Sequence, residues 1–319
     1  MQVTFKVYRK DPEKDGKPSR ANYPVELLDG ATVLDGLQKI RDELDSSLAF
    51  RATCARGYCG ECMIRVNNSA RLACIAKVSA FTQKGPEVSL DPLRNIPVIK
   101  DLVFDFDAFL WNKIKAVKPW LEPMEDVSDG ENLVSDAAMK DIRKVMSCYS
   151  CGMCDEGCTV LPVDFDFLGP AALTKAYRLA FDPRNKDAGE QVKIVEKPKG
   201  IWDCVHCYEA DEHCPRGIEP TKRIVALRDR AFKSGITHET VARHHKSFAA
   251  SVKESGWLDE GRLAIESEGL TNLKGLMKLV PTAAKAMVRG KAPIPYMHSK
   301  RPDADKIKKI FEKAEQEEK

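Results

Sequence analysis

The chain has 319 residues, a length that accommodates about two domains and a tail. Its 43% hydrophobic and 31% charged residues are typical of globular proteins, and a formal net charge of +3 excludes a strongly basic nucleic-acid-binding surface as the basis of its function. The sequence contains no run of about eighteen apolar residues, so it predicts no membrane-spanning helix. The N-terminus begins directly with strand-like alternation and shows no apolar signal segment, so we expect the eleven cysteines to be reduced thiols in the cytoplasm.

The first elements predict a small sheet with one helix. Residues 3–9 alternate apolar and polar side chains, the period-2 pattern of a half-buried strand. A second strand is expected at 23–28, after a loop rich in Lys, Pro, Asp and Gly. Residues 32–44 then place apolar side chains at helical spacing, with Thr32 as the expected N-cap. Two strands, a helix and then a cysteine-rich loop follow the order of a β-grasp domain.

The cysteine-rich loop has the spacing of a [2Fe–2S] site. Three cysteines in a C-x4-C-x2-C pattern are followed, after eleven residues, by a fourth, which is the arrangement of plant-type ferredoxins. Gly57 and Gly60 let the chain wrap a cluster closely, whereas four buried structural thiols would not require glycines in so short a loop. The candidate ligands are Cys54, Cys59, Cys62 and Cys74.

Residues 86–125 are expected to connect two domains, because five prolines interrupt them. Within this connection residues 103–120 have the apolar spacing of a helix.

Two further cysteine runs predict a ferredoxin fold with two clusters. The first run, 148–158, has the C-x2-C-x2-C-x3-C spacing in which three thiolates hold one cluster and the fourth reaches the other. The second run supplies the reciprocal ligands. Seven cysteines in this pattern exceed the four ligands of a zinc site, and we expect helices at 173–181 and 224–232 to enclose the clusters. The seven are Cys148, Cys151, Cys154, Cys158, Cys204, Cys207 and Cys214.

The tail changes in composition after Ser234. Between Gly269 and Pro302 there are seven Lys or Arg residues and no Asp or Glu, and Leu273, Met277 and Val280 share a helix face. Three interpretations stay open at this point: contact with an anionic membrane surface, contact with an acidic partner, or an ordinary amphipathic helix docked on its own domain.

The sequence therefore predicts an α+β chain. We expect a β-grasp plant-type [2Fe–2S] ferredoxin domain at 1–105 and an all-helical bacterial-ferredoxin-like domain at 106–234. A basic helical C-terminal extension is expected at 235–319.

These residues resemble the iron–sulfur subunit of succinate dehydrogenase and fumarate reductase. The resemblance covers about residues 3–230 in collinear order. It includes Arg51-Ala-Thr-Cys-Ala-Arg-Gly-Tyr-Cys-Gly-Glu-Cys62, Leu72-Ala-Cys74, Asp91-Pro-Leu, Pro97-Val-Ile-Lys-Asp-Leu, Gly169-Pro-Ala-Ala-Leu and Ala176-Tyr-Arg178.

The resemblance implies a role in electron transfer, with no catalytic residue of its own. In that family electrons pass from a FAD-containing partner subunit through [2Fe–2S], [4Fe–4S] and [3Fe–4S] centres to quinone. A membrane-associated quinone-reactive or cysteine-rich subunit is the second expected partner, so the chain is expected on the inner face of the cell membrane through its partners. The resemblance gives Cys54, Cys59, Cys62 and Cys74 to the first centre, and Cys148, Cys151, Cys154 and Cys214 to the second.

The third centre departs from the family pattern. Cys158 and Cys204 are in place, but Ala210 stands where the family has a cysteine, and Cys207 stands where it has none. The centre is then [3Fe–4S] with three thiolates, or a [4Fe–4S] centre with a non-cysteine ligand. Asp211 is the preferred oxygen ligand; Glu209, His213 and solvent are the others.

The tail looks like the C-terminal part of small heterodisulfide-reductase subunits. This suggests the less common succinate/fumarate enzymes, whose membrane partner is a peripheral, cysteine-rich subunit. A soluble electron-transfer module of a thiol-linked reductase is the alternative function. The direction of the reaction and the quinone depend on reduction potentials, which the sequence does not fix.

Overall fold

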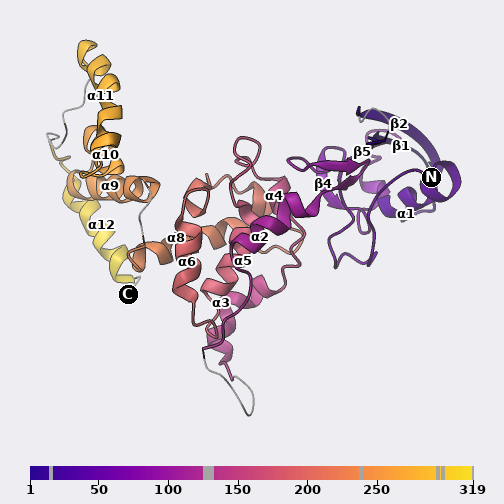
Figure 1. The fold of residues 1–319 in the computed structure, drawn as a ribbon, viewed down its shortest axis with the longest axis horizontal. Helices are drawn as coiled ribbons and strands as arrows, with labels where there is room; N and C mark the ends of the chain where they lie inside the picture. The colour runs from indigo at the N-terminus through magenta and orange to yellow at the C-terminus, as the bar shows by residue number, and fades with distance from the viewer. Residues whose placement is uncertain (14–16, 125–132, 237–239, 292–294, 296–298, 318–319) are drawn as a thin grey trace. The chain divides into compact units, whose positions relative to one another are not determined.

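A computed structural model describes residues 1–13, 17–124, 133–236, 240–291, 295 and 299–317. The chain forms two compact units (Figure 1). The first unit comprises residues 1–195 and 199–230, and the second comprises 196–198 and 231–319. The division into three domains stays a prediction.

The first unit begins with a five-stranded sheet in the order β2-β1-β5-β3-β4. β1 runs antiparallel to β2 and parallel to β5, and β3 runs antiparallel to both β4 and β5. The strands are β1 (Gln2–Arg9), β2 (Ser19–Glu26), β3 (Met63–Val66), β4 (Ser69–Leu72) and β5 (Glu87–Asp91). The predicted first strand is confirmed, and the second lies earlier than the expected 23–28.

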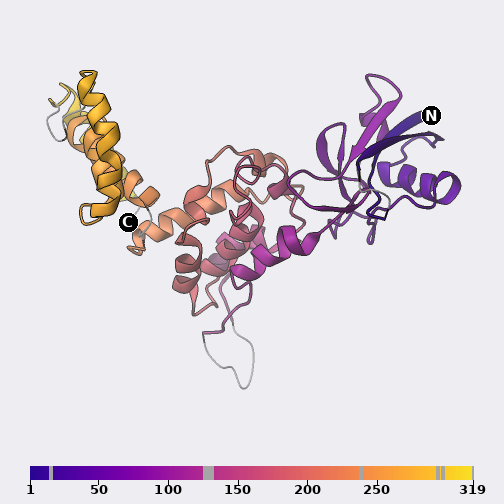
Figure 2. The ribbon, with the colours of Figure 1, turned by 45° about the horizontal axis from the view of Figure 1, so that its top comes forward.

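One helix packs on this sheet, as the order of elements predicted. α1 (Val33–Lys39) is capped by Thr32, whose side chain accepts from the Asp35 N–H, and continues into a π-helical turn, η1 (Ile40–Leu44). A Cβ placed on Gly36 of α1 would lie 2.4 Å from the ring of Phe5 on β1, so the missing side chain allows helix and sheet to approach closely. Figure 2 shows α1 alongside the strands.

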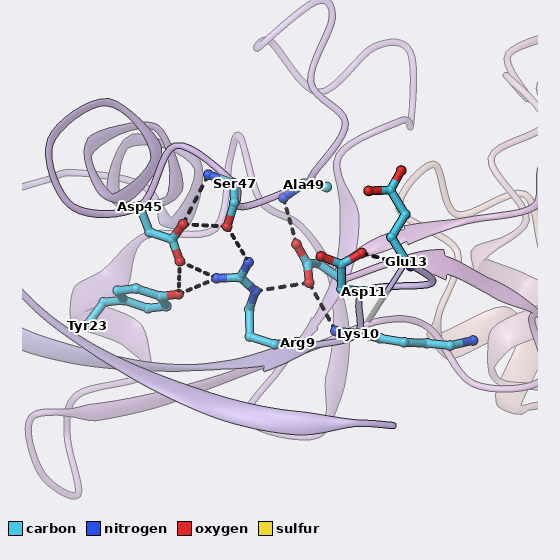
Figure 3. A network of polar contacts seen from close by, with 9 residues as sticks. Arg9, Lys10, Asp11, Glu13, Tyr23, Asp45, Ser47 and Ala49 are labelled. Atoms are coloured by element: carbon cyan, nitrogen blue, oxygen red, sulfur yellow. Dashed lines mark hydrogen bonds and ion pairs between the residues drawn. The ribbon is translucent and has the colours of Figure 1, made fainter. Parts of the chain in front are cut away.

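A polar network fastens the end of β1 to the segments that follow η1. The Arg9 guanidinium contacts Asp45, Tyr23 and Ser47 (Figure 3). Its Nε also donates to buried Asp101 Oδ1 at 2.9 Å. These charge-assisted bonds hold β1 and β2 to the turn after η1 and to Asp101, so they join four separate segments of the chain.

The connecting segment differs from the expected helix at 103–120. A short 3-10 turn, η2 (Val78–Ala80), precedes it, and β6 (Val98–Lys100) pairs with β7 (Val103–Phe104) in a hairpin. Helical structure starts only at η3 (Asp107–Trp111) and α2 (Asn112–Ala116), because Asp105 Oδ1 accepts from the N–H groups of Asp107 and Ala108. It ends before Pro119, where Lys118 has a φ of 48°.

The rest of the first unit is helical. The helix predicted at 224–232 lies within α8, which begins at Pro220. The helix predicted at 173–181 corresponds to α5, which begins earlier, at Gly169, with Pro170 in its first turn, and ends one residue earlier, at Ala180. The elements are α3 (Asp136–Met146), α4 (Met153–Glu156), α5 (Gly169–Ala180), α6 (Ala188–Glu196), η4 (Ile201–Asp203), α7 (Glu209–Glu212) and α8 (Pro220–Lys233). The predicted α+β fold class, a sheet domain followed by helices, is confirmed.

The second unit is a small helical array. Its helices are α9 (Thr240–Ser255), α10 (Glu260–Glu268), α11 (Leu273–Val288) and α12 (Ala304–Glu317). α9 packs against α10 and α12, and α11 contacts α10. Among the described residues, no helix has both the length and the apolar character needed to cross a bilayer.

Candidate iron–sulfur cluster sites

The first cysteine loop folds around its own sulfur atoms. Gly57 N–H, from the loop, donates to Cys74 Sγ at 3.1 Å, which joins the loop to the fourth cysteine beyond β4. Cys54 Sγ accepts from three further backbone N–H groups at 3.3–3.4 Å, those of Arg56, Tyr58 and Cys59. Positive φ angles at Ala55, Gly57 and Gly60 turn these N–H groups inward.

Donors of this kind stabilise negative charge on sulfur. They lower the pKa of Cys54 to about 6 and so favour its thiolate form. A cysteine binds iron in this form. Burial instead raises the pKa of Cys62 to about 12, with Cys74 and Cys59 near enough to add to the rise. The structure thus brings all four predicted residues of this loop together, and inward N–H groups fit a sulfur-rich anionic cluster.

Four of the other cysteines line one cavity. They are Cys148, Cys151, Cys154 and Cys214, and the cavity is partly open to solvent. Burial raises the pKa of Cys151 to about 12, and Cys148 and Cys214 contribute. Ile218 N–H donates to Cys214 Sγ at 3.3 Å. A cavity lined by four thiols fits the predicted four-iron centre, whose charge would be balanced by such donors.

The three remaining cysteines form a second group. Burial raises the pKa of Cys158 to about 11, and the nearby Cys204 thiol adds to the rise. Burial also raises the pKa of Cys204, with Cys207 adding to the rise and Arg228 opposing it. Arg228 donates to the Cys204 carbonyl at 2.6 Å and so fixes the start of this loop.

The two cysteine runs of the helical region repeat one backbone conformation. In the first, Ser150 and Gly152 have φ angles of 55° and 82°, and in the second His206 and Tyr208 have 55° and 63°. Gly152 directly precedes the one-turn helix α4, and Tyr208 directly precedes the one-turn helix α7. In this repeat buried Ala210 occupies the place that Cys154 has in the first run.

The repeat extends to an aspartate that caps the next long helix. Asp155 Oδ1 accepts from Ala171 N–H at 2.8 Å at the start of α5. Asp211 Oδ1 accepts from Thr221 N–H at 2.7 Å at the start of α8. Burial raises the pKa of Asp155 to about 7, although this hydrogen bond opposes the rise. Asp211, the oxygen ligand that the sequence favoured, therefore has a structural partner of its own.

The other two residues predicted as alternative ligands, Glu209 and His213, differ: the Glu209 side chain is 46% exposed, with Oε2 3.9 Å from His213 Nδ1, whereas the His213 ring has closer partners. His213 Nδ1 lies 2.8 Å from the Glu209 carbonyl oxygen, and its Nε2 lies 3.6 Å from Glu156 Oε2. A Cβ on Gly157 would lie 2.5 Å from His213 Nδ1, so this glycine lets α4 and α7 approach each other.

The first loop touches the second directly. A Cβ placed on Gly60 would lie 2.4 Å from the Cβ of Cys151 and 3.0 Å from the ring of Tyr149. Gly60 follows Cys59, a candidate ligand of the first centre, and Cys151 lines the four-thiol cavity of the second. Gly60, which has no side chain, is therefore the residue that lies between these two candidate centres.

A buried carboxylate fastens the same junction. Glu156, at the end of α4, is 1% exposed, and its Oε1 lies 3.0 Å from Arg94 Nε and 3.4 Å from Arg65 Nε. Both arginines belong to the sheet region. A buried charge requires such partners, so this triad fixes the sheet region against the helices.

Sequence reasoning missed Gly60 as a contact, and it missed Glu156, Arg65 and Arg94 entirely. The only available signal was Asp155-Glu156 inside a cysteine run, where acidic residues beside thiolates are electrostatically unfavourable.

Within the described part of the chain, no three Cys, His, Asp or Glu side chains converge on a single-ion site. Cluster ligands need not converge in this way, because the thiolates of one centre are distributed over two or more iron atoms.

Comparisons with known proteins agree with this geometry. Residues 4–111 match the model of a 2Fe-2S iron-sulfur cluster binding domain, and residues 144–218 match a 4Fe-4S dicluster domain. The fumarate reductase iron-sulfur subunit of Mycobacterium tuberculosis is 35% identical over 225 residues, covering 70% of this chain and 90% of the relative. The chain belongs to the family of fumarate reductase and succinate dehydrogenase iron–sulfur subunits.

Two more relatives extend the comparison. The 8-methylmenaquinol:fumarate reductase iron-sulfur subunit of Wolinella succinogenes is 34% identical over 254 residues, covering 78% of this chain and 79% of the relative. A chain of the Mycobacterium smegmatis Sdh1 complex in the apo form superimposes with a TM-score of 0.67 at 25% identity, covering 74% of this chain and 98% of that one. The predicted electron-transfer subunit is confirmed, and the thiol-linked alternative is not favoured.

Proposed function

We propose that this iron–sulfur subunit relays electrons between a FAD-containing partner and a membrane-associated quinone-reactive partner. The relatives named above are subunits of fumarate reductases and of an Sdh1 complex, which supports both partners. We assign the first centre to Cys54, Cys59, Cys62 and Cys74; the second to Cys148, Cys151, Cys154 and Cys214; and the third to Cys158, Cys204 and Cys207. The similarity of the C-terminal tail to heterodisulfide-reductase subunits stays a prediction.

Bound clusters would supply one-electron redox chemistry, and the protein's own work is to hold them near one another. The observation that carries the proposal is the contact of Gly60 with Cys151. It supports the proposal because the backbone of the first loop lies against Cys151, which we assign to the second centre. The Glu156 triad keeps the two loops in that position. Inward N–H groups on Cys54 and Cys74 stabilise thiolate charge and so contribute to the potential of the first centre.

For the third centre we propose a [3Fe–4S] cluster held by three thiolates. Ala210 offers no ligand at the place where the first run has Cys154. The Asp211 carboxylate already caps α8, which supports this assignment over a four-iron centre with Asp211 as ligand. Electron paramagnetic resonance of the oxidised, anaerobically purified complex tests it, since an oxidised three-iron centre is paramagnetic and a low-potential four-iron centre is silent. A silent spectrum, with two four-iron centres appearing on reduction, would refute the assignment.

The relay is tested by Gly60→Ala in the holo-complex. We expect reduction of the second centre through the first to slow in rapid-mixing experiments, while both centres keep their spectra, because the new Cβ forces the two loops apart. Gly30→Ala is the matched control: Gly30 also has a positive φ, of 83°, but no atom lies within 4 Å of its Cβ position. Equal rates for the two variants would contradict the proposal.

The first assignment is tested separately by Cys59→Ser. We expect it to remove or distort the [2Fe–2S] spectrum and to leave the centres of the helical region in place. An unchanged [2Fe–2S] spectrum would overturn this ligand set.

A further inference from the structure

Helix α11 of the second unit has three distinct faces. Its packing edge is narrow: Gly275 is buried, with its Cβ position 2.2 Å from Glu268 Oε2, and Leu279 is half-buried. Asn272 caps the helix by accepting from the Gly275 N–H at 3.0 Å. These contacts hold α11 at the end of α10 and leave most of it projecting past α9 and α10 (Figure 1).

The second face is apolar and exposed. From Leu273 the residues follow at spacings of four, three and seven, and exposed Ala284 fills the longest gap, so they form one stripe with Val288 at its edge. Their exposed fractions are 74% for Leu273, 73% for Met277, 60% for Val280, 67% for Met287 and 89% for Val288. A soluble surface rarely leaves so continuous an apolar stripe uncovered, so a partner surface is expected to cover it.

The third face is cationic and borders the apolar stripe. Lys274, Lys278, Lys285 and Arg289 are all exposed and recur at spacings of four and seven. The sequence from Gly269 to Pro302 adds three more Lys or Arg and contains no Asp or Glu. The complementary surface must therefore be both apolar and anionic.

The composition of these faces favours lipid over protein. Lysine is depleted in protein interfaces, whereas Tyr, Trp, Phe, Met and Arg are enriched. Helix α11 has two methionines but no aromatic residue, and three lysines lie in it, with one arginine directly after it. Helices that lie in the plane of an anionic bilayer combine an apolar face with flanking lysines. Pro281 also has no N–H to donate to the Met277 carbonyl, which suits the hydrated headgroup level better than the hydrocarbon interior.

We infer that α11 binds the surface of a bilayer containing anionic lipids. The apolar stripe enters the headgroup boundary and the lysines contact lipid phosphates. This contact is made by the chain itself and is separate from any attachment through partner subunits, so it does not depend on the proposed electron relay.

Flotation of the full-length holo-protein with lipid vesicles tests the inference. We expect it to float with vesicles of equal parts phosphatidylcholine and phosphatidylglycerol, and not with phosphatidylcholine alone. Met277→Glu should reduce the partition coefficient by about tenfold or more, because it buries a charge in the apolar stripe. Lys278→Gln should reduce it by about fivefold, the effect of one cation near an anionic surface.

Two variants serve as matched controls. Thr282→Glu adds the same charge to the same helix but lies away from the apolar stripe, and Lys309→Gln removes an exposed cation from α12. We expect Thr282→Glu to float more strongly than Met277→Glu, and Lys309→Gln more strongly than Lys278→Gln. Circular dichroism and the cluster spectra should be unchanged in all four, since the altered side chains are exposed.

Three outcomes would overturn the inference: no flotation of the unaltered protein, equal flotation of Met277→Glu and Thr282→Glu, or unchanged flotation of Met277→Glu together with loss of a co-purifying subunit. The last would assign the stripe to a protein partner. Failure of the relay experiments would leave the flotation result intact, and the reverse also holds.

Discussion

The two cysteine runs of the helical region share a backbone and differ in side chains. Both have a left-handed residue before a one-turn helix and an aspartate that caps the following helix. The first run has Gly152 and Cys154 at the places where the second has Tyr208 and Ala210. The backbone is therefore set by the turn and the caps, while the side chains decide how many ligands the run can offer. This separation means that the cluster type can be changed without changing the fold.

The largest effect is expected from Cys154→Ala, which gives the first run the ligands of the second. Loss of a thiolate from the four-thiol cavity should remove the four-iron centre or convert it to a three-iron one. The oxidised variant would then show an additional three-iron signal by electron paramagnetic resonance, or a lower iron content. Retention of an unaltered four-iron spectrum would exclude Cys154 as a ligand.

The converse change, Ala210→Cys, gives the second run the ligands of the first. Ala210 is buried at the matching place, so the added thiol should complete a four-iron centre. We expect the oxidised three-iron signal to disappear and a new signal to appear on reduction. An unchanged third-centre signal would show that residue 210 does not face the cluster.

Two substitutions at Asp211 distinguish its role as a helix cap from a role as a cluster ligand. Asp211→Ala should lower the free energy of unfolding by about 1 kcal/mol, because the Thr221 N–H loses its acceptor. Asp211→Asn keeps an oxygen acceptor and should cost less. Neither should change the third-centre spectrum. A changed spectrum in both variants would make Asp211 a ligand and would weaken the three-iron assignment.

The sequence predicted what local spacing determines. Cysteine spacing located both ferredoxin-like segments, and apolar periodicity located α1, α5 and α8, because these depend on neighbours within a few residues. The same periodicity failed at Val103–Phe104, where pairing with β6 prevails over helical spacing. Contacts between distant segments leave no such signal. Gly60 against Cys151 is of this kind, as is the ion pair of Glu156 with Arg94.

The smallest effect concerns the left-handed residue itself. Tyr208 has a φ of 63°, a conformation that costs a non-glycine residue about 1 kcal/mol, whereas Gly152 adopts 82° without that cost. Tyr208→Gly should therefore raise the free energy of unfolding by up to about 1 kcal/mol, partly offset by the greater freedom of glycine in the unfolded chain. Gly152→Ala should lower it by a similar amount. Thermal unfolding of the holo-protein measures both. If Tyr208→Gly is instead markedly destabilising, the tyrosine side chain makes contacts that outweigh the backbone strain, and the two runs differ in packing as well as in ligands.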